Sequence, residues 1–195
     1  MITKLSTALT KALLKRNIVS ADDEELYVYG FFMIFSYLIF FFLTLLLGLI
    51  LRIPIESVVF YVTFCVIRNY AGGIHADTET KCTVFTTISI TVSLIIIKLL
   101  ITYNLIISSS VMMVLAGICL FVFAPLSNEQ KKIDKNERLR FRKKTILYTI
   151  VAMTLVSLTF IFKVCSSIGI AISIGIFLSA ALLVLGSINH ITTKM

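Results

Sequence analysis

The sequence predicts an all-α, polytopic membrane protein with about six transmembrane helices and an amphipathic N-terminal helix in the membrane interface. Of its 195 residues, 58% are hydrophobic and 14% are charged, whereas a soluble domain has roughly 25% charged residues. Several apolar runs approach or exceed the roughly 20 residues that a helix needs to cross a bilayer. Basic residues gather at the ends of these runs. We therefore expect one membrane-embedded domain over residues 1–195.

Residues 1–25 are expected to form an interfacial helix and an acidic linker. Within 1–19, Leu5, Leu9 and their apolar neighbours fall on one face at i, i+3, i+4 spacing. The segment lacks the continuous apolar core of a secretory signal. It suits a helix in the membrane interface, and a helix packed on the rest of the protein is the alternative. Residues 22–25 are all acidic, which favours a solvated linker.

Six apolar runs follow, and each is predicted to be a helix that crosses the membrane. Arg52 and Pro54 end the first run. The second run is the shortest and carries Glu56, so a re-entrant segment is its alternative. In order, the runs are Tyr29–Leu51, Ile55–Ile67, Thr83–Leu100, Leu105–Ala124, Ile146–Phe162 and Ile168–Ile188, before a tail at Asn189–Met195.

The basic residues predict which side of the membrane each segment faces. With six crossings and the N-terminus inside, the inner segments carry 4, 2, 8 and 1 of the 18 basic residues, and the outer connections carry three. An excess of Lys and Arg is typical of cytoplasmic segments. The polar segment 68–82, the basic loop 126–145 and both termini are therefore expected in the cytoplasm. The net charge of +8 then reports topology and contact with anionic lipid rather than nucleic-acid binding.

The polar segment 68–82 reads RNYAGGIHADTETKC and holds His75 and Cys82, a residue pair known from cysteine nucleophiles. Seven residues apart on one helix, the two would be separated by about 10 Å, so a working pair needs a helix break between them. Gly72-Gly73 permits unusual backbone angles before the histidine. If Cys82 lies in the first turn of the next helix, the helix dipole and Lys81 favour its thiolate. A polar loop without catalytic function is the alternative.

Other residues allow several roles or argue against alternative kinds of site. Asn69, Asp77 and Glu79 are equal candidates to orient the imidazole. We expect no metal and no cofactor, because a structural zinc needs four ligands and His190 lies in the distant tail. A small transporter or exporter is the rival class, but no charged residue lies well inside a span. The remaining cysteines are expected to be buried as small hydrophobes: Cys65, Cys119 and Cys165.

The segment resembles the motif of the accessory gene regulator B family of membrane peptidases. The matching elements are Arg68, the Tyr-Ala pair, Gly73, the His-Ala pair and the H-x6-C spacing. The resemblance implies a bacterial cysteine endopeptidase of a quorum-sensing system, with Cys82 as nucleophile and His75 as general acid/base. Its partner would be a membrane-associated precursor peptide, cut near its C-terminal end through an acyl-thioester and cyclised to a thiolactone. A homodimer, and electrostatic steering of an acidic precursor tail by 126–145, are family-level expectations, with lipid contact as the alternative for that loop.

Overall fold

A computed structural model describes residues 2–16, 18–72, 79–125 and 135–192, and all of its elements there are helices. The predicted all-α class is confirmed. The chain divides into two compact units, residues 1–43 and 44–195. The elements are α1 (Ile2–Lys15), the 3-10 helix η1 (Ala21–Asp23), α2 (Glu24–Ile50), α3 (Pro54–Ala71), α4 (Glu79–Thr102), α5 (Ile106–Phe123), α6 (Lys135–Ile161) and α7 (Ser166–Thr192).

Five segments within the described residues are long and apolar enough to cross a membrane, and they coincide with five of the six expected spans. The exception is α3, the helix of the second expected span. It has 18 residues and carries Glu56 in its first turn and Arg68 in its last. The crossing of the membrane by α3 stays a prediction. The five segments are Ala21–Ile50, Thr83–Thr102, Ile106–Phe123, Glu137–Ile161 and Ser166–Ser187.

In the first unit, α1 leaves its apolar face uncovered. The side chains of Leu5 and Leu9 are 55% and 38% exposed. Ser6 and Thr10 are buried instead, and their hydroxyls donate hydrogen bonds to the carbonyl oxygens four residues earlier, at 3.0 and 2.9 Å. Within the described part of the first unit the apolar face is therefore not covered, as expected for a helix that packs on lipid or on another surface.

The acidic residues 22–25 differ from the expected linker. Asp22 and Asp23 belong to η1, and Glu24 and Glu25 form the first turn of α2. Negative side chains are stabilised at this position by the positive end of the helix dipole. The Ser20 hydroxyl also donates a hydrogen bond of 2.8 Å to the Asp23 carboxylate. The acidic run thus starts the first membrane-crossing helix.

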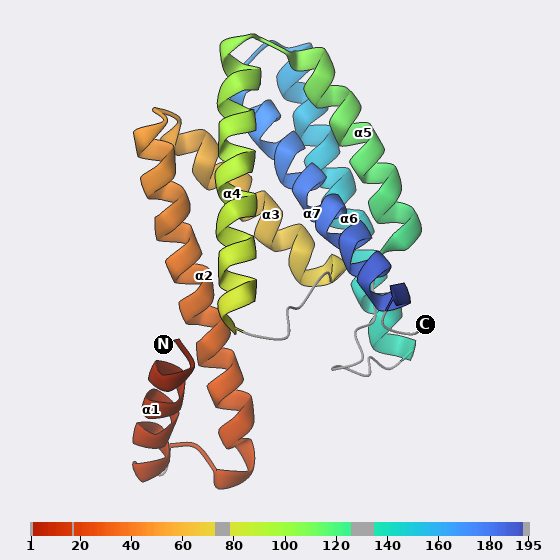
Figure 1. The fold of residues 1–195 in the computed structure, drawn as a ribbon. Helices are drawn as coiled ribbons and strands as arrows, with labels where there is room; N and C mark the ends of the chain where they lie inside the picture. The colour runs from red at the N-terminus through yellow and green to blue at the C-terminus, as the bar shows by residue number, and fades with distance from the viewer. Residues whose placement is uncertain (1, 17, 73–78, 126–134, 193–195) are drawn as a thin grey trace. The chain divides into compact units, whose positions relative to one another are not determined.

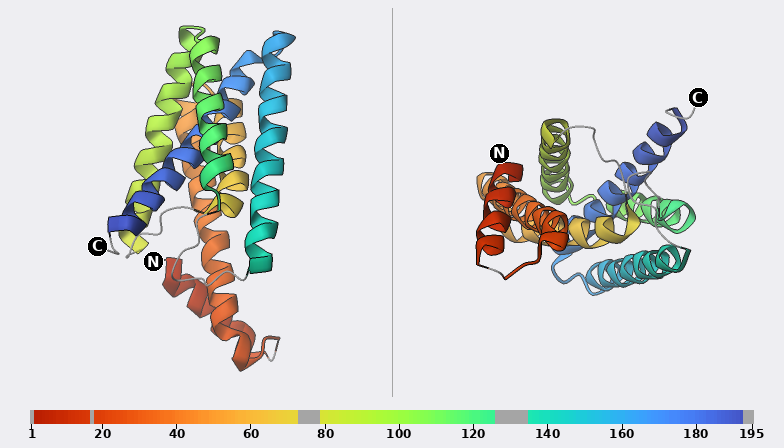
Figure 2. Two further views of the ribbon diagram at one scale, coloured as in Figure 1. Left: turned by 90° about the vertical axis from the view of Figure 1, so that its right-hand side faces the viewer. Right: turned by 90° about the horizontal axis from the view of Figure 1, so that it is seen from below.

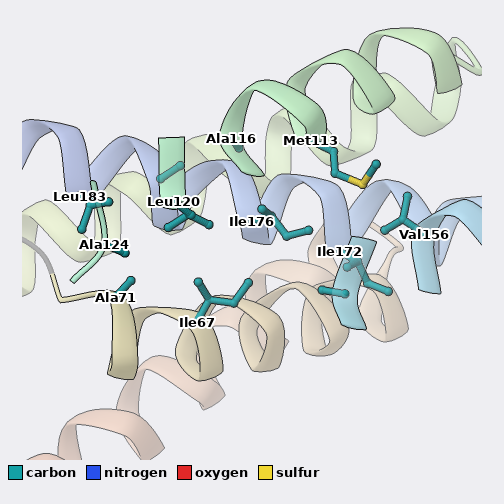
Figure 3. Packing of buried hydrophobic residues seen from close by; sticks show 12 residues of the cluster. Ile67, Ala71, Met113, Ala116, Leu120, Ala124, Val156, Ile172, Ile176 and Leu183 are labelled. Atoms are coloured by element: carbon teal, nitrogen blue, oxygen red, sulfur yellow. The ribbon is translucent and has the colours of Figure 1, made fainter. Parts of the chain in front are cut away.

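The core of the second unit is built around α7. This helix contacts α3, α4, α5 and α6 and runs obliquely across the bundle (Figures 1 and 2). The largest cluster of buried side chains lies where α3, α5 and α6 meet α7, as Figure 3 shows. Its members include Ile67, Ala71, Met113, Leu120, Val156, Ile172, Ile176 and Leu183.

Small residues on α7 allow α3 to approach closely. A Cβ atom on Gly175 would lie 3.1 Å from the Phe60 carbonyl oxygen and 3.0 Å from the Cβ of Thr63. One turn later, the buried Ser179 hydroxyl donates to the Gly175 carbonyl at 2.8 Å and lies 3.5 Å from the Phe64 carbonyl. Small residues are typical of helix contacts in membranes because they bring two backbones together. One face of α3 is therefore packed on protein, while Ile55 and Val62 on the helix remain 65% and 51% exposed.

Two other boundaries differ from the expectation. The basic segment 126–145 was expected to be a loop, but α6 begins at Lys135, so its second half is helical. The tail expected at Asn189 also continues as helix, because α7 ends at Thr192. Both errors have the same origin, since hydropathy marks the part of a helix inside the membrane and not the turns that extend beyond it.

Candidate functional site

The candidate segment 68–82 begins with the last turn of α3. Ala71 is fully buried in the core cluster, and the guanidinium carbon of Arg68 lies 5.6 Å from the centre of the Phe64 ring. Gly72 ends the helix with φ 78° and ψ −164°, and its N–H donates to the Arg68 carbonyl at 3.1 Å. A residue with a side chain rarely adopts this positive φ, so glycine is the residue suited to redirect the chain here.

The segment ends on α4. This helix begins at Glu79, so Cys82 is its fourth residue and lies in the first turn, as the sequence predicts. Backbone N–H groups in a first turn lack carbonyl partners within the helix, and together they carry a partial positive charge. Such a position lowers the energy of a thiolate relative to a thiol. For Glu79 to Cys82 the structure describes the backbone alone.

His75 falls in residues 73–78, outside the described part of the chain, and Gly73 and Asp77 lie there with it. The approach of His75 to Cys82 therefore stays a prediction. Of the other candidate residues, Asn69 is exposed and Arg68 is half-buried. The helix end at Ala71 and the new start at Glu79 agree with the requirement that the two site residues do not share one straight helix.

A cluster of side chains joins the end of α3 to the start of α6. The Tyr70 ring is stacked on Tyr148, with ring centres 5.2 Å apart and planes at 25°. It also makes a tilted contact with Phe141 at 6.1 Å. The Lys144 ammonium nitrogen lies 4.9 Å from the centre of the Tyr70 ring. We call Tyr70, Phe141, Lys144 and Tyr148 the α3–α6 clamp, because it holds the last turn of α3 against α6 beside the core cluster, on which Tyr148 also packs.

This clamp was not predicted from the sequence. A signal was present, since Phe141, Lys144 and Tyr148 recur at spacings of three and four residues and so share one face of a helix. The prediction of a loop over residues 126–145 hides this helical face. Pairing with Tyr70 also depends on how α3 and α6 pack, which the local pattern does not reveal.

The end of α3, the start of α4 and the start of α6 lie at the same end of the second unit (Figures 1 and 2). The start of α6 makes this end strongly positive, because every basic residue at 138–144 is exposed. The end of α3 and the first half of α6 are therefore neighbours in the fold, whereas the sequence predicted only that they face the same side of the membrane. The exposed cations are Arg138, Arg140, Arg142, Lys143 and Lys144.

The other cysteines are only partly as expected. Cys65 on α3 and Cys119 on α5 are half-buried, but Cys165 is exposed, which corrects the prediction of burial. Cys165 lies in the connection from α6 to α7 with φ 52°, and no neighbouring helix covers a turn at the end of the bundle. Within the described residues, no group of three or more His, Cys, Asp or Glu side chains is arranged to hold a metal ion.

Comparisons with known proteins point in one direction. The family model described as accessory gene regulator B matches residues 4–185 of this chain. "Putative AgrB-like protein 2" of Clostridium perfringens (strain 13 / Type A) is 25% identical over 149 residues, which cover 74% of this chain and 70% of that protein. "Putative AgrB-like protein" of Clostridium perfringens (strain SM101 / Type A) is 24% identical over 149 residues, with the same coverage. No solved structure matches.

Proposed function

Because the chain belongs to the accessory gene regulator B family, we propose that it is a membrane cysteine endopeptidase that processes the precursor of a peptide signal. The single observation that carries this proposal beyond family membership is the place of Cys82 in the first turn of α4. There the helix start favours a thiolate. His75, from the segment that precedes α4, is the proposed proton carrier.

The first proposed step is attack by the Cys82 thiolate on a carbonyl carbon near the C-terminal end of the precursor. The oxyanion that forms accepts hydrogen bonds from free backbone N–H groups, such as those at the start of α4. The carbon–nitrogen bond then breaks, and its electron pair leaves with the amine, which takes a proton from His75. The upstream part of the precursor remains on Cys82 as a thioester.

The second proposed step releases the product. A thiolate within the bound peptide attacks the thioester carbonyl, the bond to Cys82 breaks, and Cys82 leaves as a thiolate. One thioester replaces another, so the exchange is close to neutral in energy and the ring keeps the activation of the original acyl group. Attack by water would lose that activation, so a site that excludes water favours the cyclic thiolactone.

The test is precursor cleavage by purified protein in lipid vesicles, followed by mass spectrometry of the peptide and of the protein. Cys82→Ala and His75→Ala are each expected to abolish cleavage while expression and membrane insertion stay unchanged. Cys165→Ala is the matched control, because it removes an exposed thiol from the α6–α7 connection. Wild-type protein should also carry the peptide acyl group on Cys82, and hydroxylamine should release it. Cleavage that persists in either site variant would refute the mechanism.

A further inference from the structure

The outer face of α6 is apolar along its membrane-crossing part. Leu147, Ile150, Val151 and Leu158 recur at helical spacing and are between 46% and 57% exposed. The opposite face is buried, with Thr145, Thr149 and Val156 at 0% exposure. Because the segment Glu137–Ile161 is a candidate membrane span, this exposed face is the one that meets lipid.

Two of the basic residues at the start of α6 continue this lipid-facing stripe. Lys143 lies four residues before Leu147, and Arg140 lies three residues before Lys143, so all three share one face. The other cations point elsewhere. Arg142 precedes the buried Thr145 by three residues, and Lys144 lies over the ring of Tyr70. The helix therefore separates a lipid-facing pair, Arg140 and Lys143, from Arg142 and Lys144 on the protein side.

The lipid-facing pair also lies at the right depth. The apolar part of α6, from Thr145 to Ile161, is about 25 Å long at 1.5 Å per residue. The hydrocarbon core of a bilayer is about 30 Å thick. Lys143 and Arg140 come about 3 and 8 Å before Thr145 along the axis, which places them at the edge of the hydrocarbon. Their long side chains reach outward from such a position to the headgroups.

We propose that Arg140 and Lys143 bind the phosphate headgroup of an anionic phospholipid beside the start of α6. The charges are complementary, and a guanidinium pairs with phosphate through two parallel hydrogen bonds. Glu137, the one acidic residue described in this part of α6, lies three residues before Arg140 and seven before Lys144, so it borders the pair on one side and leaves the pair's net charge positive. Each cation near an anionic surface favours an anionic over a neutral lipid by roughly fivefold. This binding does not depend on the proposed peptidase activity.

The chain contains no tryptophan, so one introduced indole reports on its lipid neighbours without background. Leu147→Trp places it on the stripe next to Lys143. In vesicles of phosphatidylcholine and phosphatidylglycerol, brominated phosphatidylglycerol is expected to quench this indole more strongly than brominated phosphatidylcholine. Leu158→Trp is the matched control reporter, on the same stripe about 16 Å farther along the helix axis and near the opposite edge of the span, and no preference due to Arg140 and Lys143 is expected there.

Substitution then assigns the preference to the pair. Arg140→Gln with Lys143→Gln is expected to lower the relative affinity for phosphatidylglycerol at the Leu147 reporter by roughly 25-fold. Arg142→Gln removes one charge on the protein side of α6 and should leave the preference in place. The preference in protein without these substitutions should also weaken as salt rises, which provides a measurement that no folding defect confounds.

Several outcomes overturn the proposal. One is an equal phosphatidylglycerol preference at both reporters, and another is a preference that survives the double substitution or is insensitive to salt. A third is a double variant that keeps its lipid preference but binds an acidic precursor peptide less well, which would make this surface a peptide site. If the wild-type protein does not cleave the precursor, the peptidase proposal is refuted and the lipid measurement is unaffected.

Discussion

Replacing Tyr70 with leucine removes the ring at the centre of the α3–α6 clamp but keeps an apolar side chain of similar reach. Two ring contacts are lost, with Tyr148 at 5.2 Å and Phe141 at 6.1 Å. Such pairs contribute about 0.5–1.5 kcal/mol each beyond their buried area. The Lys144 contact at 4.9 Å adds about 0.5–1 kcal/mol, because Lys144 is exposed. The expected loss of stability is therefore about 1.5–4 kcal/mol.

The assay is thermal unfolding of the protein in detergent. A loss of about 1.5–4 kcal/mol corresponds to a fall in Tm of about 3–16 °C for a chain of this size. Tyr70→Phe keeps both ring contacts and should unfold close to the wild-type temperature. A double-mutant cycle with Lys144→Gln should give a coupling energy of about 0.5–1 kcal/mol. If Tyr70→Leu and Tyr70→Phe unfold at the same temperature as the wild type, the clamp does not hold α3 to α6.

Three further predictions concern packing, sidedness and thiol chemistry. Gly175→Ala should destabilise the protein by about 1–3 kcal/mol, because the new Cβ meets backbone at Phe60. Gly30→Ala is the control and should not destabilise the protein, because Gly30 has open space around it. Equal unfolding temperatures of the two variants would contradict the close approach of α3 and α7. In intact cells, a membrane-impermeant maleimide should label Cys165 and not Cys82, since the two lie at opposite ends of the bundle; labelling of Cys82 would place the site outside. In detergent, alkylation of Cys82 should begin at lower pH than that of Cys165, because only the thiolate reacts and the start of α4 favours it; matching pH profiles would argue against an activated thiol.

Five of the six predicted spans coincide with helices long and apolar enough to cross a membrane, because hydropathy over about 20 residues is a local property that does not depend on neighbours. It also placed Cys82 at a helix start, since a polar run before an apolar one marks such a boundary. Boundaries outside the membrane were less predictable. Residues 22–25 and 135–145 are helical although they are charged, because exposed helical turns need no apolar residues.

The sequence by itself determined that this chain is an all-α membrane protein, which residues form five candidate spans, and which polar segment carries the candidate His75 and Cys82. Tertiary structure decided how these parts meet. It packed α3 against α6 and α7, brought Tyr70 onto Tyr148, left Cys165 exposed, and separated Arg140 and Lys143 from Arg142 and Lys144 on α6. An apolar run in the sequence indicates only that a segment is buried away from water. Lipid and protein both keep apolar side chains away from water, so the packing between helices decides which helix face contacts lipid and which contacts protein.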